Sequence, residues 1–310
     1  MINLKDNSIQ VKLILLFTAI AVVLSVSIGM LFFHKTKAIV NFSKENELKT
    51  LAVETSNKIE RFMFERNGDI EVMASSPLLR NPTMSKSVKL DYIENVRNAY
   101  KTYDYIMITD NEGKIEVLSG ELKDDNKYKS FLKYVLSGTM YVSDFNESNS
   151  VYFSAPITGS TGRIIGAVIE KMNLNAINEI VGNVHPGKSG YAYLADGEGN
   201  TIFNKYRGNV HIDFKGKNPF YLVYNNIELV SAFYPISKYS TERSNWYLIV
   251  EESAVEAFQV TTQLRNYTIA VSFVFTFVLL IFGIILSKKV GESFNELLSN
   301  LSKRQIIPIF

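Results

Sequence analysis

Acidic and amide side chains at alternate positions give one stretch of the chain the donor pattern of a calcium site. Asp196, Glu198 and Asn200 have the spacing of the first ligands of a calcium-binding loop. Such a loop also requires a glycine at its sixth position and a glutamate at its twelfth, where this chain has Thr201 and Arg207. Asp and Gly at close spacing are typical of the tight turn of a β-hairpin. The sequence therefore predicts a hairpin here and no metal site.

The side chains that most often carry catalysis form no recognisable set. The histidines His34, His185 and His211 are scattered, and none lies in a His-x-x-x-His or His-Glu-x-x-His pattern. The chain has no cysteine, which excludes disulfides, thiolate metal sites and a cysteine nucleophile. Neither Gly-x-Ser-x-Gly nor a phosphate-binding Gly-x-x-x-x-Gly-Lys-Ser/Thr occurs. We expect no catalytic residue, no metal and no cofactor, and the net charge of +2 gives no reason to expect a nucleic-acid partner.

Two uncharged stretches, 13–33 and 267–287, indicate that the chain crosses a membrane twice. Each has 21 residues, and a helix needs roughly 20 apolar residues to cross the hydrocarbon core. Lys288 and Lys289 follow the second stretch, and basic flanks tend to stay cytoplasmic. We expect a multi-pass protein of the cell membrane, in contact with the lipid bilayer, with both termini in the cytoplasm and residues 34–266 outside. A cleaved signal peptide is the alternative for the first stretch, and a buried core helix for the second.

The residues after the first stretch predict one long helix, about Lys35 to Ala74. A helix continuous with a membrane span moves as a rod and can transmit a displacement. The apolar residues along one side of this helix also predict that it packs on the outer domain or on a second copy of the chain. Pro77 and Pro82 end this helix, and a shorter one is expected at about Ser87 to Lys101. The apolar residues of the long helix recur at three- and four-residue steps: Leu48, Leu51, Ala52, Thr55, Ile59, Phe62 and Met63.

The chain then repeats itself. The stretch from Tyr105 to Ile115 resembles the stretch from Tyr191 to Ile202, because each is an apolar strand that ends in Asp-x-Glu-Gly and leads to another strand. Downstream, Ala155-Pro156-Ile157 is matched by Tyr234-Pro235-Ile236, and each half closes on an apolar strand, from Ile164 to Met172 and from Trp246 to Glu251. This spacing predicts two α+β modules in tandem.

Three further segments carry a resemblance to a known family. They are Tyr141-Val142-Ser143-Asp144 leading to Ser154-Ala155-Pro156-Ile157, the stretch from Gly162 to Val168, and the stretch from Gly187 to Asp196. In this order, with an apolar span on each side, they resemble the double Cache ectodomain of bacterial transmembrane sensors. The resemblance implies an α+β fold with a long N-terminal helix and two tandem PAS-like modules, each a five- or six-stranded antiparallel sheet, flanked by two transmembrane helices.

The resemblance also implies where a small molecule binds. The expected pocket is in the membrane-distal module, about Tyr103 to Met172, between the sheet and a helix and loop at about Asp125 to Ser143. In the amino-acid-binding branch of the family, an Arg-x-Trp-Tyr stretch holds the ligand carboxylate, and an Asp at the end of the last strand pairs with the ammonium. The resemblance places Lys129 at the Arg, Phe131 at the Trp, Leu132 at the Tyr and Lys171 at the Asp.

A lysine at that Asp position changes the expected ligand. Lys171 repels an ammonium group, so a ligand with one or two carboxylates is expected if Lys129 and Lys171 both face the pocket. Two alternatives stay open. In the first, both lysines lie on the surface. In the second, the register is shifted by one residue and brings Glu170 into the pocket, which reverses the expected charge of the ligand.

Further candidates line the same region. Ser143 and Asp144 lie in the loop where the family often hydrogen-bonds its ligand. Five aromatic residues, which could instead be core, have the spacing to line the pocket: Tyr128, Phe131, Tyr134, Tyr141 and Tyr152. In the second module we expect Tyr191, Tyr193 and Trp246 in the core.

The predicted organisation has seven parts. A cytoplasmic N-terminus (1–12) and a first span (13–33) precede the stalk and connecting helices (34–102). The distal module (103–186), the proximal module (187–266) and the second span (267–287) follow. Residues 288–310 have an amphipathic stripe that resembles the start of a HAMP linker, and no kinase, cyclase or methyl-accepting output domain fits there. These features predict a non-enzymatic sensory input unit, expected to be a homodimer, whose signal serves chemotaxis, a sensor kinase or a diguanylate cyclase. A membrane-anchored assembly protein that binds another protein is the alternative.

Overall fold

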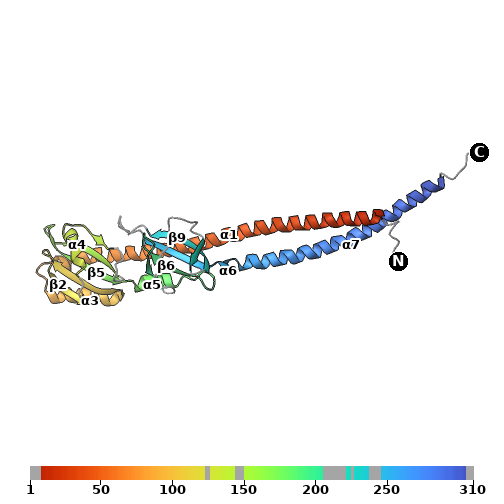
Figure 1. The fold of residues 1–310 in the computed structure, drawn as a ribbon. Coiled ribbons are helices and arrows are strands. Elements are labelled where there is room, and N and C mark those ends of the chain that lie inside the picture. Colours follow the sequence, from red (N-terminus) through yellow and green to blue (C-terminus); the bar gives the residue numbers. More distant parts are fainter. Residues whose placement is uncertain are drawn as a thin grey trace, which may run out of the picture. The chain divides into compact units, whose positions relative to one another are not determined.

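Two long helices begin and end the folded chain. The computed structural model describes residues 8–122, 126–143, 150–204, 221–224, 227–236 and 246–304. Helix α1 (Ser8–Ser75) has 68 residues and α7 (Gln259–Arg304) has 46; both are marked in Figure 1. The chain divides into two compact units, one made of residues 1–44 and 258–310 and the other of residues 45–257. The predicted long helix after the first span is confirmed.

The first unit holds the two candidate membrane spans. The N-terminal part of α1 and most of α7 are each long and apolar enough to cross a membrane. Small and hydroxylic residues meet between them: the Thr276 hydroxyl donates a hydrogen bond to the Ser25 hydroxyl (3.0 Å). A methyl group added at Gly29 would lie 3.0 Å from the Ser272 hydroxyl. Such residues let membrane helices approach closely, because lipid offers no hydrophobic force that would drive the helices together.

In the second unit, the end of α1 is followed by α2 (Pro77–Arg80) and by α3 (Lys86–Tyr100), which lies close to the predicted second helix. The Ser85 hydroxyl caps α3 by accepting a hydrogen bond from the Val88 N–H. Five strands and one helix follow: β1 (Tyr103–Asp110), β2 (Ile115–Gly120), α4 (Tyr128–Val135), β3 (Tyr141–Val142), β4 (Ser150–Thr158) and β5 (Ile164–Asn173). All pairings are antiparallel, and the strand order is β2-β1-β5-β4-β3.

A second sheet repeats this order as β7-β6-β10-β9-β8. Its elements are α5 (Asn175–Gly182), β6 (Tyr191–Ala195), β7 (Thr201–Phe203), β8 (Tyr221–Tyr224), β9 (Ile227–Ile236), β10 (Trp246–Ser253) and α6 (Ala254–Ala257). The predicted repeat is therefore confirmed, and each half contributes one five-stranded sheet. Helix α5 packs against β6 of this second sheet. Tyr191, Tyr193 and Trp246 are buried, as predicted for core residues.

The hairpin turns of the two halves have the same hydrogen bonds. Asp110 accepts from the N–H groups of Glu112 and Lys114. Asp196 accepts in the same way from Glu198 and Asn200. Glycine follows at a positive φ in both turns (+85° at 113 and +91° at 199), a conformation that favours residues without a side chain. The carboxylate with calcium-like spacing thus closes a hairpin turn, as the sequence predicts.

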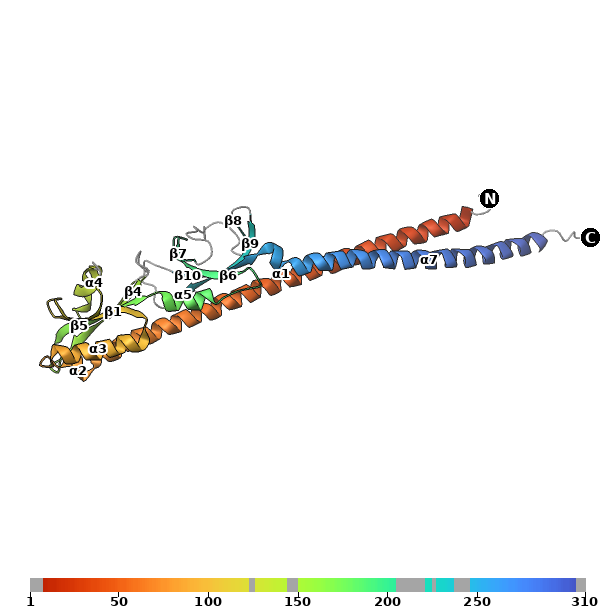
Figure 2. The same ribbon diagram turned by 90° about the horizontal axis from the view of Figure 1, so that it is seen from below.

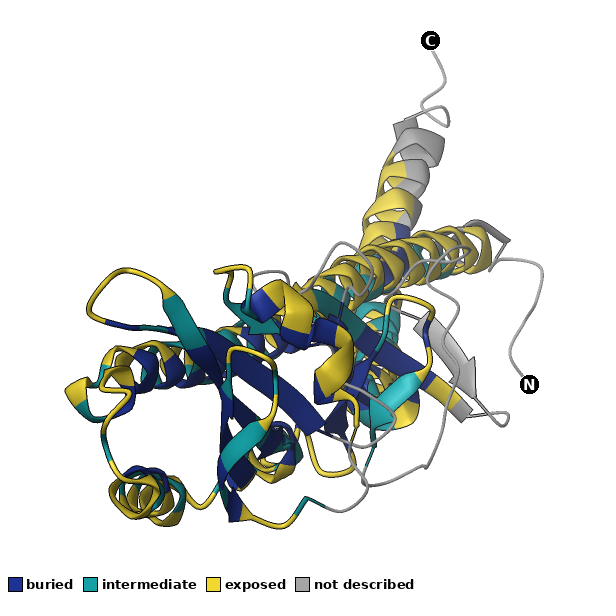
Figure 3. Cartoon of the chain, turned by 90° about the vertical axis from the view of Figure 1, so that its left-hand side faces the viewer, coloured by how far each residue is buried: buried dark blue, intermediate teal, exposed yellow. Residues whose placement is uncertain are grey.

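Helices cover both faces of the first sheet. Figure 2 shows α4 on one side of β1 and β5, with α3 and the end of α1 on the other. The predicted apolar stripe of α1 is buried in this unit: Leu48, Ala52, Ile59 and Met63 are fully enclosed, as is Ile70 about two turns further on. Figure 3 shows the buried strands between the exposed outer surfaces of the helices. The sheet therefore has two different faces, one toward α4 and one toward α1 and α3.

Candidate functional site

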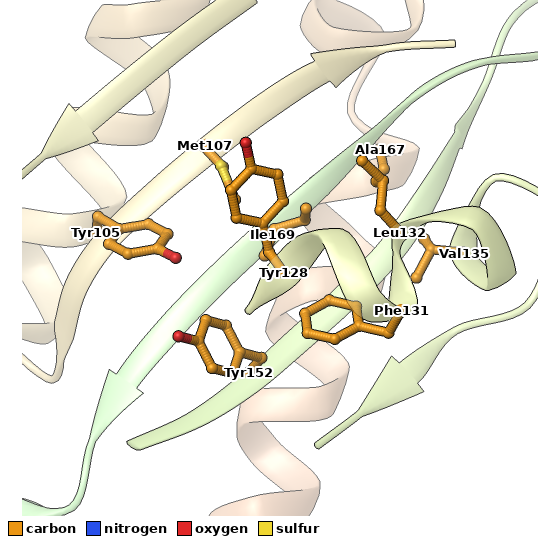
Figure 4. Close-up of a cluster of buried hydrophobic side chains, with 9 residues drawn as sticks. All are labelled: Tyr105, Met107, Tyr128, Phe131, Leu132, Val135, Tyr152, Ala167 and Ile169. Atoms are coloured by element: carbon orange, nitrogen blue, oxygen red, sulfur yellow. The ribbon is translucent and has the colours of Figure 1, made fainter. Parts of the chain in front are cut away.

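The α4 face of the first sheet holds most of the predicted site residues. Helix α4 is strongly one-sided: Tyr128, Phe131, Leu132 and Val135 are buried and point toward the sheet. They pack with side chains of β1, β4 and β5 in one cluster, drawn in Figure 4. The members contributed by the strands are Tyr105, Met107, Tyr152, Ala167 and Ile169.

Ring-to-ring contacts organise this cluster. The Phe131 ring stacks on Tyr141, with 4.6 Å between centroids and 19° between planes. It also meets Tyr152 at 5.5 Å in a tilted arrangement. Tyr134 touches the edge of Tyr141 but is 54% exposed. Phe131 therefore connects α4 to β3 and β4, the two strands next to the predicted ligand loop.

Lys171 is a cation that points toward α4. Side chains alternate along β5, so Ala167, Ile169 and Lys171 point toward α4. The register pairs Lys171 with Tyr105 on one side and with Tyr152 on the other. Its Nζ lies 5.8 Å from each ring centroid, within the range of a cation–π contact. Tyr105 was not among the predicted site residues; the pairing of β1 with β5 is the feature that would have indicated it.

Glu170, the alternative pocket residue, points the other way. It pairs with Ile106 and Phe153, and its side chain lies against α1 with no exposed surface. Burial and the nearby Asp69 carboxylate raise the pKa of Glu170 well above its usual value. The described register therefore gives the α4 face a lysine and the α1 face a buried acid.

Ser143 forms hydrogen bonds within the sheet. Its hydroxyl accepts a hydrogen bond from the Tyr152 N–H, and its own N–H donates to the Tyr152 carbonyl, both at 2.9 Å. Ser143 is buried and holds the end of β3 to β4. Asp144, the neighbouring candidate, lies outside the described residues.

Lys129 lies on another surface. It is exposed and lines a recess of about 480 Å³ between α4 and the β1–β2 turn. Asn111, Glu112, Lys133 and Ser137 border the same recess. The structure thus places Lys129 away from the aromatic cluster, whereas it places Tyr128, Phe131, Tyr141, Tyr152 and Lys171 together.

No group of three or more His, Cys, Asp or Glu side chains that could hold a metal ion occurs among the described residues. On the α4 face, the described residues place the Lys171 ammonium beside the Tyr105 and Tyr152 rings, next to a buried apolar cluster. A lysine ammonium beside apolar surface can attract a small anion.

Comparison with known proteins identifies the family. A family model described as a Cache domain matches residues 36–261, most of the chain. The chain therefore belongs to the Cache-domain family, which confirms the resemblance seen in the sequence. A search of curated protein sequences finds no match.

Solved structures with the same fold are ligand-binding domains of bacterial chemoreceptors. The domain of Pseudomonas fluorescens CtaA, in complex with L-isoleucine, is 16% identical at a TM-score of 0.54 and covers 73% of this chain and 98% of its own. That of Pseudomonas aeruginosa PctB, with L-Arg, is 15% identical at 0.53 and covers 69% and 97%. That of Campylobacter jejuni Tlp3, with 4-methylisoleucine, is 18% identical at 0.54 and covers 70% and 94%. These identities establish a shared fold, and the two apolar helices beside a Cache domain make the chain a membrane protein.

Proposed function

We propose that this protein is the input unit of a transmembrane receptor and that its distal module (103–186) binds a small carboxylate outside the cell. The observation that carries the proposal is the position of Lys171 on the α4 face, between Tyr105 and Tyr152. The chemoreceptor domains of the same fold were solved with amino acids, each of which has a carboxylate.

The chemistry of the α4 face favours an anion over an amine. A lysine ammonium attracts a carboxylate and repels a ligand ammonium at the same point. Ring faces stabilise the lysine when water is excluded, and its ammonium would attract a bound carboxylate. Phe131, Tyr141 and Tyr152 supply apolar surface for the remainder of the ligand. Ser143 and Asp144 are also proposed to contact the ligand.

The signal would pass from the modules to the membrane helices. A ligand that binds one arrangement of α1 and the sheet better than another shifts the population toward that arrangement. The module between 187 and 266 and the spans at 13–33 and 267–287 then carry the change inward, with both termini in the cytoplasm. An output of chemotaxis, kinase or cyclase type would receive it.

The receptor is proposed to be a homodimer. The outer face of α1 supports this, because Phe64 (57% exposed) and Val72 (68% exposed) lie eight residues apart on it. Nothing lies within 4 Å of a methyl group placed at Gly68 between them. An apolar stripe with a gap at its centre suits the close approach of a second α1.

A ligand screen on the domain 34–266 tests the site, since the solved relatives are isolated ligand-binding domains. Small carboxylates, amino acids, amines and purines would be compared by thermal shift. A ligand at 100 times its Kd stabilises by about 2.7 kcal/mol, which for a domain of this size is a rise of roughly 5–10 °C. The rise should come from a carboxylate, disappear in Lys171→Gln, and persist in Lys129→Gln, the matched control on the other surface.

The other outcomes separate the remaining hypotheses. Loss of binding in Lys129→Gln with retention in Lys171→Gln would move the anion site to the recess beside the β1–β2 turn. Stabilisation by an amine would contradict the assigned ligand charge. No response to any class of compound would favour the membrane-anchored assembly protein, whose outer domain binds a protein partner.

A further inference from the structure

A second polar group lies on the opposite face of the distal sheet, between the sheet and α1. It consists of Arg66 and Asp69 from α1, Tyr100 from α3, Tyr103 from β1 and Glu170 from β5, and is called the α1 cluster below. Nothing in the proposed ligand site uses these residues. They are the titratable groups that interact with Glu170 from each element packed on it.

Three members of the α1 cluster, Arg66, Asp69 and Tyr100, interact with one another without Glu170. Arg66 pairs with Asp69 at 3.0 Å, and the Tyr100 hydroxyl donates to the other Asp69 oxygen at 3.0 Å. The Arg66 guanidinium also lies over the Tyr100 ring, 4.3 Å from its centroid. Within the α1 cluster, one cation and one anion therefore neutralise each other before Glu170 is considered, and Arg66 also lies 4.0 Å from the exposed carboxylate of Glu65.

Glu170 is the second acid of the α1 cluster and takes no part in the Arg66–Asp69 ion pair. It has no exposed surface, and neither of its carboxyl oxygens has a hydrogen-bond partner of sound geometry among the described residues. A buried carboxylate that lacks well-formed hydrogen bonds is unstable and takes up a proton. Burial and the repulsion of Asp69 raise the pKa of Glu170 well above its usual value, and together they outweigh Tyr103 and Arg66, which favour the ionised form.

We propose that Glu170 is a proton-binding site that makes the packing of α1 on the distal sheet dependent on external pH. When Glu170 is neutral, the α1 cluster carries one ion pair and the helix packs on the sheet. When Glu170 ionises, two carboxylates compete for the single guanidinium of Arg66. The surplus negative charge is relieved by admitting water, which separates α1 from β5.

The position of Glu170 connects its protonation to both the proposed ligand site and α1. Glu170 and Lys171 are consecutive on β5 and point to opposite faces, so a shift of this strand end moves both. Helix α1 is continuous from the cluster to Ser8. The proton is thus a second stimulus, which acts with or without a ligand on the α4 face.

The sign and size of the effect follow from linkage. Because the packed state binds the proton more tightly, the packing is strongest at low pH and weakens as pH rises through the raised pKa of Glu170. One proton changes the opening equilibrium by at most about tenfold per pH unit.

Hydrogen exchange of the full chain in lipid nanodiscs tests the proposal. The amides of residues 62–74 in α1 would be followed by mass spectrometry between pH 5.5 and 9 in the native protein and in Glu170→Gln. Gln has the shape of the protonated acid and cannot ionise. The intrinsic exchange rate cancels when the two proteins are compared at the same pH. Glu94→Gln, an exposed acid on α3, is the matched control.

The native protein should lose protection in α1 relative to Glu170→Gln by up to tenfold per pH unit, and Glu94→Gln should behave as native. Asp69→Asn provides an independent check, because it frees Arg66 for Glu170 and should move the loss of protection to lower pH or abolish it. An identical pH response in the native protein and Glu170→Gln would overturn the proposal. So would a step that stays at the same pH in Asp69→Asn.

Discussion

Replacement of Phe131 by leucine tests how strongly α4 is held on the sheet. Leucine keeps an apolar side chain at a buried helical position but loses the stack on Tyr141 and the tilted contact with Tyr152. An aromatic pair adds about 0.5–1.5 kcal/mol beyond its buried area. The loss of two such contacts should therefore reduce the free energy of unfolding by about 1–3 kcal/mol, whereas Phe131→Ala should cost about 3–5 kcal/mol because it also leaves a cavity.

Differential scanning calorimetry of the domain 34–266 would measure the change. For a domain of this size, each kcal/mol corresponds to roughly 2–4 °C in Tm, so Phe131→Leu should melt about 2–12 °C lower. Tyr134→Leu is the control, since Tyr134 is on the same helix, is 54% exposed and has only an edge contact with Tyr141. It should change Tm by much less.

A double-mutant cycle with Tyr141→Leu isolates the stacked pair. The coupling free energy between positions 131 and 141 should be about 0.5–1.5 kcal/mol. If Phe131→Leu costs no more than Tyr134→Leu, or if the coupling is zero within error, α4 is not held by the described ring contacts, and the reasoning about this face is refuted.

Three further changes have defined outcomes. Ser143→Ala leaves the buried Tyr152 N–H without its acceptor and should cost about 1–3 kcal/mol in chemical denaturation, more than Ser143→Thr, which keeps a hydroxyl; equal costs would contradict this. Glu256 accepts from the Ser189 hydroxyl and from backbone N–H groups, which lowers its pKa. Glu256→Gln should therefore lower stability near neutral pH, and its deficit should shrink as pH falls through the lowered pKa; a deficit independent of pH would exclude this role. In the cysteine-free chain, Val72→Cys should form an intermolecular disulfide in membranes if two copies of α1 meet; absence of crosslinking would count against the dimer.

The sequence alone determined the elements and their order. The spans, the helix after the first span and the two hairpins follow from local rules: length of apolar run, three- and four-residue periodicity, and Asp and Gly at turns. The repeat from Tyr105 and from Tyr191 also predicted two α+β modules in tandem, and the two observed sheets have equivalent strand orders. These features depend on residues near one another in the chain, so they can be read without a structure.

For the candidate site, the sequence determines less, and the tertiary structure more, than for the fold. Alternation along β5 establishes that Glu170 and Lys171 point to opposite faces, but it does not say which face receives α4. That choice depends on the pairing of β5 with β1 and β4 and on the position of α1, which are contacts between residues far apart in sequence. Lys129 shows the same limit, because helical periodicity places it on the exposed side of α4 only once the buried side is known.

The α1 cluster could not be seen in the sequence at all. Nothing in the sequence singles out Arg66 or Asp69, and Glu170 is there only the alternative to Lys171 in an open register. Only the tertiary structure brings α1, α3, β1 and β5 together, and only then does one acid exceed the available cations in a place that water does not reach. Charge balance in a buried space is a property of the packing, whereas the pattern that builds the packing is a property of the chain.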